Sequence, residues 1–269
     1  MIHTYFGIEK LPFNTDDFSL LKHQQDIYEI LKVHSHQGGF CLVMGEPGTG
    51  KTIIKDSIRL LADKFTIVIT IARTLHTFTN TIKILCHAFN TDFDGSLFKC
   101  EKRLIEEAFN LHRIGKSVFL IIDDAHLMDM ETLRRLRLLF EDFPKNSNIV
   151  LIGQPSLLHH ISLSINSDIF SRITYSVILP KLNPDDMRSF ILSQFDNVQL
   201  PHNTLDDDSL ALIIKSSSGI FRKAKYLVLS CLLEASRSRK KIVTLDIVNR
   251  ILLQPHYRVE SDVNHLFNL

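Results

Sequence analysis

Short apolar runs alternate with longer segments of helical period between residues 40 and 180. The runs are residues 40–44, 65–71, 118–122, 149–152 and 177–179. Residues 118–122 contain no polar side chain, as expected of a strand that is buried on both faces of a sheet. Strands that alternate with helices are typical of an α/β fold, so we predict a mainly parallel sheet flanked by helices.

Helical period is found between these runs, over residues 76–90, over residues 101–113 and in the stretch that follows Lys51. In that last helix the apolar side chains recur at the spacing of one helix face. We therefore expect its inward face to be formed by Ile53, Ile54, Ile58, Leu60 and Leu61.

The strands stop after Pro180, and three helix starts follow. The first, Asn183-Pro184-Asp185-Asp186, combines a capping side chain, a proline in the first turn and acids at the positive end of the helix dipole. The others lie at residues 206–208 and 244–246. This change of pattern predicts a domain boundary near residue 181. The predicted divisions are an α/β domain over residues 1–180, a small helical domain over residues 181–254 and a tail over residues 255–269.

The composition is that of an ordinary globular chain, with 45% hydrophobic and 23% charged residues. The formal net charge is +1, so binding to nucleic acid would depend on a local basic surface. The four cysteines and thirteen histidines do not show the spacing of a metal site. There is no signal-peptide pattern, and no apolar run approaches the roughly 18 residues of a membrane span. We therefore expect a cytoplasmic protein without a membrane span.

Residues 45–52, Gly-Glu-Pro-Gly-Thr-Gly-Lys-Thr, match the phosphate-loop pattern GxxxxGK[ST] in full. The glycines let backbone N–H groups turn toward a polyphosphate, and the next helix presents its positive end there. Lys51 is expected to reach the β- and γ-phosphates of ATP, and the Thr52 hydroxyl to ligate Mg²⁺. A glycine-rich turn without a ligand is the alternative, but the flanking strand and helix favour a nucleotide site. The residues assigned to it are Gly45, Glu46, Pro47, Gly48, Thr49, Gly50, Lys51 and Thr52.

Two acidic residues, Asp123 and Asp124, directly follow the apolar run 118–122. Because ligands bind at the carboxyl ends of parallel strands, Asp123 is expected to hold Mg²⁺. Asp124 takes the place where many such ATPases have a Glu that orients the attacking water. The side chain of Asp is one methylene shorter, so we expect slow hydrolysis. A capping role at the strand end is the alternative for Asp124.

Three further polar residues are candidates for the same reaction. Gln154 follows the run 149–152 and suits sensing of the γ-phosphate, or is a turn residue beside Pro155. Arg172 precedes the last strand, where an arginine finger that acts across a subunit boundary usually lies. Arg222 lies near a helix start in the second domain, from which it can reach the nucleotide. Either arginine can instead form an ordinary surface ion pair.

Together these motifs resemble those of AAA+ ATPases and, more narrowly, of the ExeA/GspA-like branch. The similarity extends over about residues 5–250. The segments that carry it are Tyr5-Phe6-Gly7-Ile8 with Pro12-Phe13, Gly39-Phe40-Cys41-Leu42-Val43-Met44, Ile121-Ile122-Asp123-Asp124-Ala125-His126, Gly153-Gln154-Pro155 with Leu157, Phe170-Ser171-Arg172-Ile173, and Gly219 with Arg222.

The resemblance implies an AAA+ core and a helical lid with nucleotide between them, and ATP-dependent assembly into a ring or helical filament. It leaves two functional classes. Secretion or pilus-assembly ATPases normally carry a membrane span and a periplasmic region, and neither is expected here unless a separate membrane partner supplies them. Transposition helper ATPases of the MuB, TniB and TnsC types are compact, assemble on duplex DNA and recruit or activate a transposase. The second class is the one that we expect.

Two basic clusters are candidates for contact with DNA. One lies on a predicted helix after Asp123 and the other precedes the last helix start; either can be a solvated helix face instead. A filament would repeat a weak phosphate contact many times. Residues 255–269 are expected to form an arm that docks on a partner, or a last packed helix. The basic clusters are Arg134, Arg135 and Arg137, and Arg237, Arg239, Lys240 and Lys241.

Overall fold

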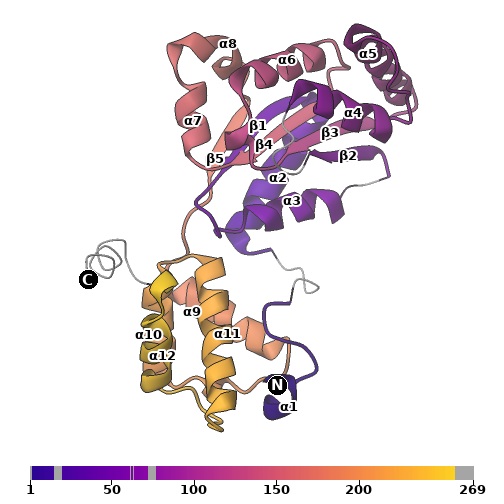
Figure 1. The fold of residues 1–269 in the computed structure, drawn as a ribbon. Coiled ribbons are helices and arrows are strands. Elements are labelled where there is room, and N and C mark those ends of the chain that lie inside the picture. The colour runs from indigo at the N-terminus through magenta and orange to yellow at the C-terminus, as the bar shows by residue number, and fades with distance from the viewer. Residues whose placement is uncertain (1, 15–19, 61, 63, 72–76, 258–269) are drawn as a thin grey trace. The chain divides into compact units, whose positions relative to one another are not determined.

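The computed structural model describes residues 2–14, 20–60, 62, 64–71 and 77–257. These residues form two compact units, each with its own core. One is an α/β unit that runs from residue 20 to residue 179, apart from residues 47–49. The other contains the helices that follow Pro180 (Figure 1).

The α/β unit is built on a five-stranded sheet in the order β2-β3-β4-β1-β5 (Figure 1). All of its strand pairs are parallel, which confirms the predicted architecture. Each apolar run of the sequence became a strand, and the strand ends differ from the expected ends by at most a few residues. The strands are β1 Gly39–Met44, β2 Thr66–Ile71, β3 Ser117–Ile122, β4 Asn148–Gly153 and β5 Tyr175–Ile178.

Helices cover both faces of this sheet because alternate residues of each central strand point to opposite sides. In β1, Leu42 and Met44 belong to one apolar cluster, whereas Cys41 and Val43 belong to the other. The first cluster is shared with helices α4 to α8, and the second with helices α2 and α3 (Figure 1). The helices are α2 Lys22–Gln37, α3 Lys51–Leu60, α4 Phe78–Ala88, α5 Leu97–Arg113, α6 Met130–Glu141, α7 Ser156–Ile161 and α8 Ser167–Phe170.

Two details of these helices differ from the sequence prediction. Helix α5 begins four residues before the expected residue 101, since the Ser96 hydroxyl accepts the backbone N–H of Lys99 at 3.4 Å and so caps it. In α3, Ile54 and Ile58 are buried as expected, but Leu60 is 67% exposed. Two residues beyond Ile58 the helix has turned by about 200°, so Leu60 faces away from the sheet. Leu61 lies outside the described residues.

The second unit has the helices α9 Pro184–Asp196, α10 Asp207–Ser217, α11 Phe221–Arg237 and α12 Leu245–Leu252. Two of the predicted helix starts are confirmed. The predicted cap Asn183 accepts the N–H of Asp186 through Oδ1, and Asp206 Oδ1 accepts that of Ser209, both at 2.7 Å. Apolar side chains from all four helices fill the core of the unit. Fully buried among them are Phe195, Ile213, Leu227, Cys231 and Ile247. Among the helices of the described residues, none has the length and apolarity that crossing a membrane requires.

The amino-terminal residues 2–14 also belong to this second unit, although the sequence prediction placed them with the α/β domain. Helix α1 Ile2–Phe6 packs against α11. The Phe13 ring lies 5.6 Å from that of Phe190 in α9, and Lys225 Nζ donates to the Phe13 carbonyl at 3.0 Å. These contacts could not be foreseen because they join residues about two hundred positions apart in the chain. Of the tail, residues 255–257 form a short 3₁₀ turn and residues 258–269 lie outside the described residues.

Candidate nucleotide site

The phosphate loop connects the end of β1 to the start of α3. Its first residue is tied to the neighbouring strand, because Gly45 N–H donates to the Gly153 carbonyl at 3.1 Å. Gly48 and Gly50 have φ angles of 87° and 95°, a conformation that side chains other than glycine rarely adopt. Two of the glycines in the phosphate-loop pattern, Gly48 and Gly50, therefore lie where the backbone requires a positive φ.

Lys51 and Thr52 begin helix α3. Lys51 Nζ donates to the carbonyls of Gly45 at 2.7 Å and Glu46 at 2.9 Å, so the ammonium lies against the loop that it follows. The Thr52 side chain is exposed. A loop of this shape, at a helix N-terminus and with a lysine beside it, has the donor groups that a polyphosphate requires.

Asp123 directly follows β3, with its backbone N–H bonded to the Ile71 carbonyl at 2.9 Å. Its Oδ1 accepts the backbone N–H of Asp124 at 3.0 Å, and its Oδ2 accepts Lys55 Nζ at 2.7 Å. Lys55 was not singled out from the sequence. Its position one helical turn after Lys51 is the signal that could have revealed it, because residues four apart share a helix face.

Asp124 has a left-handed backbone, with φ 51°, and precedes the short 3₁₀ helix η1 Ala125–Leu127. Asp is one of the few residues other than glycine that visits this conformation readily. Its carbonyl accepts the N–H of Leu127 at 2.9 Å, so the turn that follows β3 is hydrogen-bonded within itself. The carboxyl group is half-buried beside Asp123.

Gln154 follows β4, and its side chain contacts His126 in the turn after β3. The sequence prediction gave His126 no role in the site. Gln154 Nε2 lies 2.9 Å from His126 Nε2. The approach of the two turns is close, since a Cβ on Gly153 would lie 3.2 Å from the His126 backbone nitrogen. His126 therefore joins Gln154 to the turn that contains Asp123 and Asp124.

The oxygen atoms of the Thr52 and Asp123 side chains are suited to binding Mg²⁺ that is also bound by a nucleotide. Within the described residues there is no group of three or more His, Cys, Asp or Glu that could hold a metal ion alone. Mg²⁺ in ATP sites keeps several waters, takes oxygens from the phosphates and needs only one or two protein ligands. The Thr52 hydroxyl and the Asp123 carboxylate are such a set.

The two candidate arginines belong to different units. Arg172 follows α8, is 60% exposed and pairs with Glu141, Nε to Oε1, at 3.0 Å. Because β5 runs parallel to β1, with Tyr175 opposite Cys41, Arg172 lies toward the amino ends of the strands. Arg222 is the second residue of α11 in the second unit, to which residues 47–49 also belong, and its backbone N–H donates to the Gly48 carbonyl at 3.3 Å.

The first basic cluster is paired with carboxylates. Arg134 in α6 contacts Glu131 and Asp168, each at 3.0 Å, and its hydrogen bond lowers the pKa of Asp168. The other two arginines of α6 are bound in the same way: Arg137 pairs with Glu141 at 2.8 Å and is 11% exposed, and Arg135 pairs with Glu101 at 3.5 Å and lies 3.7 Å from the centre of the Phe78 ring. These arginines tie α6 to its neighbours.

The second basic cluster is exposed at the end of α11. Within the described part of the chain, Arg237, Arg239 and Lys240 form no ion pair. Lys241 differs from them, since its ammonium donates to the Tyr5 carbonyl and lies 4.2 Å from the centre of the Tyr5 ring. Three of the four charges therefore face solvent.

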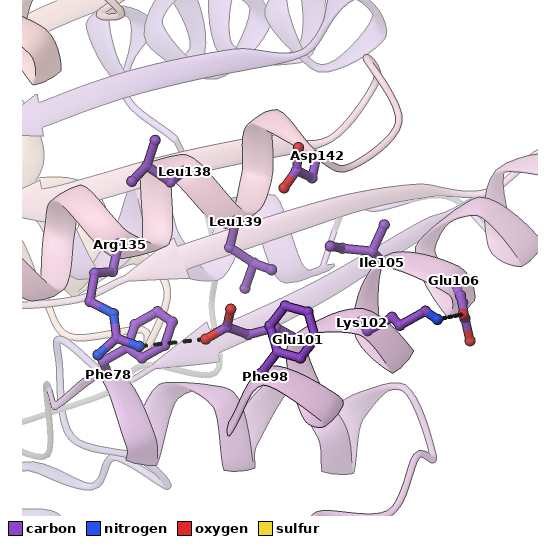
Figure 2. A pocket seen from close by; sticks show the side chains of 10 residues that line it. All are labelled: Phe78, Phe98, Glu101, Lys102, Ile105, Glu106, Arg135, Leu138, Leu139 and Asp142. Carbon is purple, nitrogen blue, oxygen red and sulfur yellow. Dashed lines mark hydrogen bonds and ion pairs between the residues drawn. The ribbon is translucent and has the colours of Figure 1, made fainter. Parts of the chain in front are cut away.

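A groove of 420 Å³ lies on the surface formed by α4, α5 and α6 (Figure 2). Phe98, 74% exposed, and Leu138, 47% exposed, are among its apolar side chains. The ion pairs Arg135–Glu101 and Lys102–Glu106 lie along it (Figure 2). None of its lining residues belongs to the phosphate loop or to the turns after β3 and β4, so it is a separate surface of the α/β unit.

Residues 33–161 match the family model described as AAA domain. That segment contains the phosphate loop, Asp123, Asp124 and Gln154. With the parallel five-stranded sheet, its flanking helices and the helical second unit, the fold is the P-loop AAA+ fold predicted from the sequence.

Among known proteins, the chain is similar to General secretion pathway protein A of Aeromonas hydrophila, with 26% identity over 258 residues. The alignment covers 92% of this chain and 47% of the relative, so the chain spans about half the length of that protein. The resemblance to the GspA-like branch agrees with this match, and the resemblance to transposition helpers stays a prediction.

Solved structures of low sequence identity share the fold. The ORC2 protein of Aeropyrum pernix superposes with a TM-score of 0.70 at 15% identity, over 92% of this chain and 72% of the other. Cdc6p of Pyrobaculum aerophilum gives 0.70 at 17%, over 97% and 73%. The RuvB Holliday junction branch migration motor of Thermotoga maritima gives 0.58 at 17%, over 90% and 71%.

Proposed function

We propose that this chain binds ATP with Mg²⁺ at residues 45–52 and hydrolyses it. One observation carries the proposal: the strand register gathers three polar segments at one edge of the sheet. Met44 lies opposite Gly153, and Ile122 opposite Leu151, so the phosphate loop, the two aspartates and Gln154 follow neighbouring strand ends. This is the edge of a parallel sheet at which ligands bind.

Each group has a role that its chemistry allows. Lys51 and the loop N–H groups hold the phosphates, and Thr52 and Asp123 hold Mg²⁺, which neutralises phosphate charge when bound. Asp124 orients the attacking water and accepts its proton. Gln154, held by His126, presents its amide beside that turn. Arg222 is proposed to contact the nucleotide.

Arg172 is proposed to act on the nucleotide of a neighbouring subunit. Its place toward the amino ends of the strands supports this role, because the phosphate loop of the same chain follows a carboxyl end. An arginine supplied in this way stabilises charge on the transferring phosphoryl group. Hydrolysis would then be slow in a single subunit and faster in a ring or filament.

We further propose that the ATP-bound subunits assemble on duplex DNA and recruit or activate a transposase. Proteins of the same fold support the DNA part of the proposal, since two solved structures are the Aeropyrum pernix ORC1 protein in complex with DNA and Drosophila ORC bound to DNA. The exposed side chains of Arg237, Arg239 and Lys240 supply a local basic surface, as phosphate contact requires.

Electron microscopy with duplex DNA tests this assembly. Purified chain is imaged with ATP, with ADP and without nucleotide, each with and without DNA. Rings or filaments on DNA in the presence of ATP alone are the expected result. Absence of any assembly under all of these conditions contradicts the DNA proposal, whereas ATP binding measured on the same sample tests the nucleotide site separately.

A second candidate function is favoured by the 26% identity to General secretion pathway protein A. In that case the ATPase would work with cell-envelope machinery through a separate membrane partner. The two functions differ in what stimulates hydrolysis. DNA stimulates the ATPase rate if the first is correct, and DNA has no effect on the rate if the second is correct.

A further inference from the structure

Lys55 and Asp123 form an ion pair at the centre of the proposed site. Lys55 Nζ lies 2.7 Å from Asp123 Oδ2, and the two side chains are 14% and 19% exposed. The other carboxylate oxygen, Oδ1, is bonded to the Asp124 N–H at 3.0 Å. Both oxygens of the residue assigned to Mg²⁺ therefore have a donor from the chain itself.

A lysine is suited to a reversible contact of this kind. Its ammonium is a compact charge on a flexible stem, so it can leave Asp123 without movement of the α3 backbone. The pair also offsets the repulsion between Lys51 and Lys55, which lie one turn apart on the same helix. With both side chains mostly shielded from water, the attraction is screened less than in an exposed pair.

We propose that Lys55 competes with Mg²⁺ for Asp123 and so sets the Mg²⁺ concentration at which nucleotide is held. Two cations at one carboxylate repel each other, so Mg²⁺ with its waters binds at Asp123 at the expense of the lysine contact. The inference rests on the proposed nucleotide site and adds a regulatory property to it: the site responds to free Mg²⁺ as well as to ATP.

The test is a Mg²⁺ titration of nucleotide binding, read by the fluorescence of a labelled ATP analogue. Lys55→Met removes the charge but keeps a side chain of similar length. The half-saturating Mg²⁺ concentration is expected to fall about fivefold, the scale of a single ion pair. Lys55→Arg, which keeps the charge, is expected to shift it less. Arg59→Met, an exposed position on the same helix, is the matched control and leaves it unchanged.

A double-mutant cycle identifies the carboxylate. In the Asp123→Asn background, Lys55→Met is expected to cause no further shift, because the charge for which the two cations compete is absent. An unchanged or raised half-saturating Mg²⁺ concentration in Lys55→Met overturns the inference. Thermal unfolding without nucleotide establishes that the variants are folded, and Lys55→Gln replaces Lys55→Met if the latter is not.

The outcome for the wild type separates this inference from the function on which it rests. Wild-type protein that binds no analogue at any Mg²⁺ concentration contradicts the proposed nucleotide site and, with it, the role of Lys55. Wild-type protein that binds the analogue, beside a Lys55→Met variant with the same Mg²⁺ requirement, contradicts the role of Lys55 alone.

Discussion

The Asp124 side chain determines how fast bound ATP is hydrolysed in the proposed mechanism. Asp124→Asn keeps the size of the side chain but removes the proton acceptor. We expect its ATPase rate to fall by about 100-fold or more, with nucleotide affinity unchanged. Steady-state ATPase assays and binding titrations measure the two quantities, and Asp142→Asn at an exposed position of the same unit is the control. An ATPase rate of Asp124→Asn equal to that of the wild type would contradict the catalytic role of Asp124 and favour a capping role at the strand end.

His126 is a positioning residue for Gln154 because the two side chains lie 2.9 Å apart. We expect His126→Ala and Gln154→Ala each to lower kcat with little change in KM. The double variant should be no slower than the slower single variant, since residues that act as a unit are not additive. Additive losses would show that the two side chains act independently.

How much of the site could be predicted depends on how far along the chain each contact reaches. Residues 45–52 and Asp123 were predicted because a local pattern is linked to a known chemistry. Lys55 and His126 were not, since their partners lie 68 and 28 residues away. The functional roles assigned to all of these residues, and to Arg172 and Arg222, remain predictions.

At the scale of single elements, Asp129 fixes the start of α6. Its carboxylate accepts the Thr132 N–H at 2.7 Å and the Thr132 hydroxyl at 2.8 Å, and the backbone hydrogen bond in particular lowers the pKa of Asp129. Asp129→Ala should therefore lower the free energy of unfolding by about 1 kcal/mol at neutral pH.

The pH dependence of this contribution has a definite sign. Since the folded-state pKa of Asp129 is lowered, its stabilisation is complete above the unfolded-state value of about 4 and is lost as the pH falls through the folded-state value. The difference between wild type and Asp129→Ala should shrink in that range in acid unfolding curves. Asp129→Asn keeps an acceptor without a proton to gain, so its own contribution should not vary with pH.

Gly219, before α11, has a φ angle of 74° and leaves no room for a side chain. An added Cβ would lie 2.4 Å from the Leu182 carbonyl oxygen. Gly7 in the same unit has a φ of 73° with nothing within 4 Å of the same atom, so it is a matched control. Gly7→Ala should cost about 1–2 kcal/mol through its backbone conformation alone. Gly219→Ala should lower the melting temperature clearly more than Gly7→Ala does. Equal decreases in the two variants would contradict the steric explanation.

Strands were predicted better than helix faces, for a physical reason. A strand buried on both faces is a continuous apolar run, so β1, β3 and β4 could be recognised without knowledge of their neighbours. Helix α2 was not predicted, since its buried apolar residues, Ile27 and Leu31, are few among polar and exposed ones. Its place is determined by the sheet face that it covers, which the local sequence does not contain.

At the scale of the whole molecule, we expect substitutions in the two basic clusters to affect DNA binding differently. We expect Arg237→Glu, Arg239→Glu and Lys240→Glu together to weaken ATP-dependent DNA binding by about tenfold or more, with a lower salt dependence. Fluorescence anisotropy with labelled duplex at several salt concentrations measures both. Nucleotide affinity should not change.

The cluster on α6 provides the comparison for that experiment. Alanine at Arg134, Arg135 and Arg137 removes the ion pairs with Asp168 and Glu141, so the melting temperature of this variant should fall. DNA binding lost in this variant, and retained in the variant of residues 237–240, would assign the DNA contact to α6.

The packing of residues 2–14 against α9 and α11 has a consequence for synthesis on the ribosome. Residues 2–14 are synthesised before the α/β unit, and the helices against which they pack are synthesised after it. The α/β unit has its own sheet and core, so it can fold before Phe190 has been synthesised and can pack against Phe13. Completion of the helical unit therefore follows synthesis of the α/β unit.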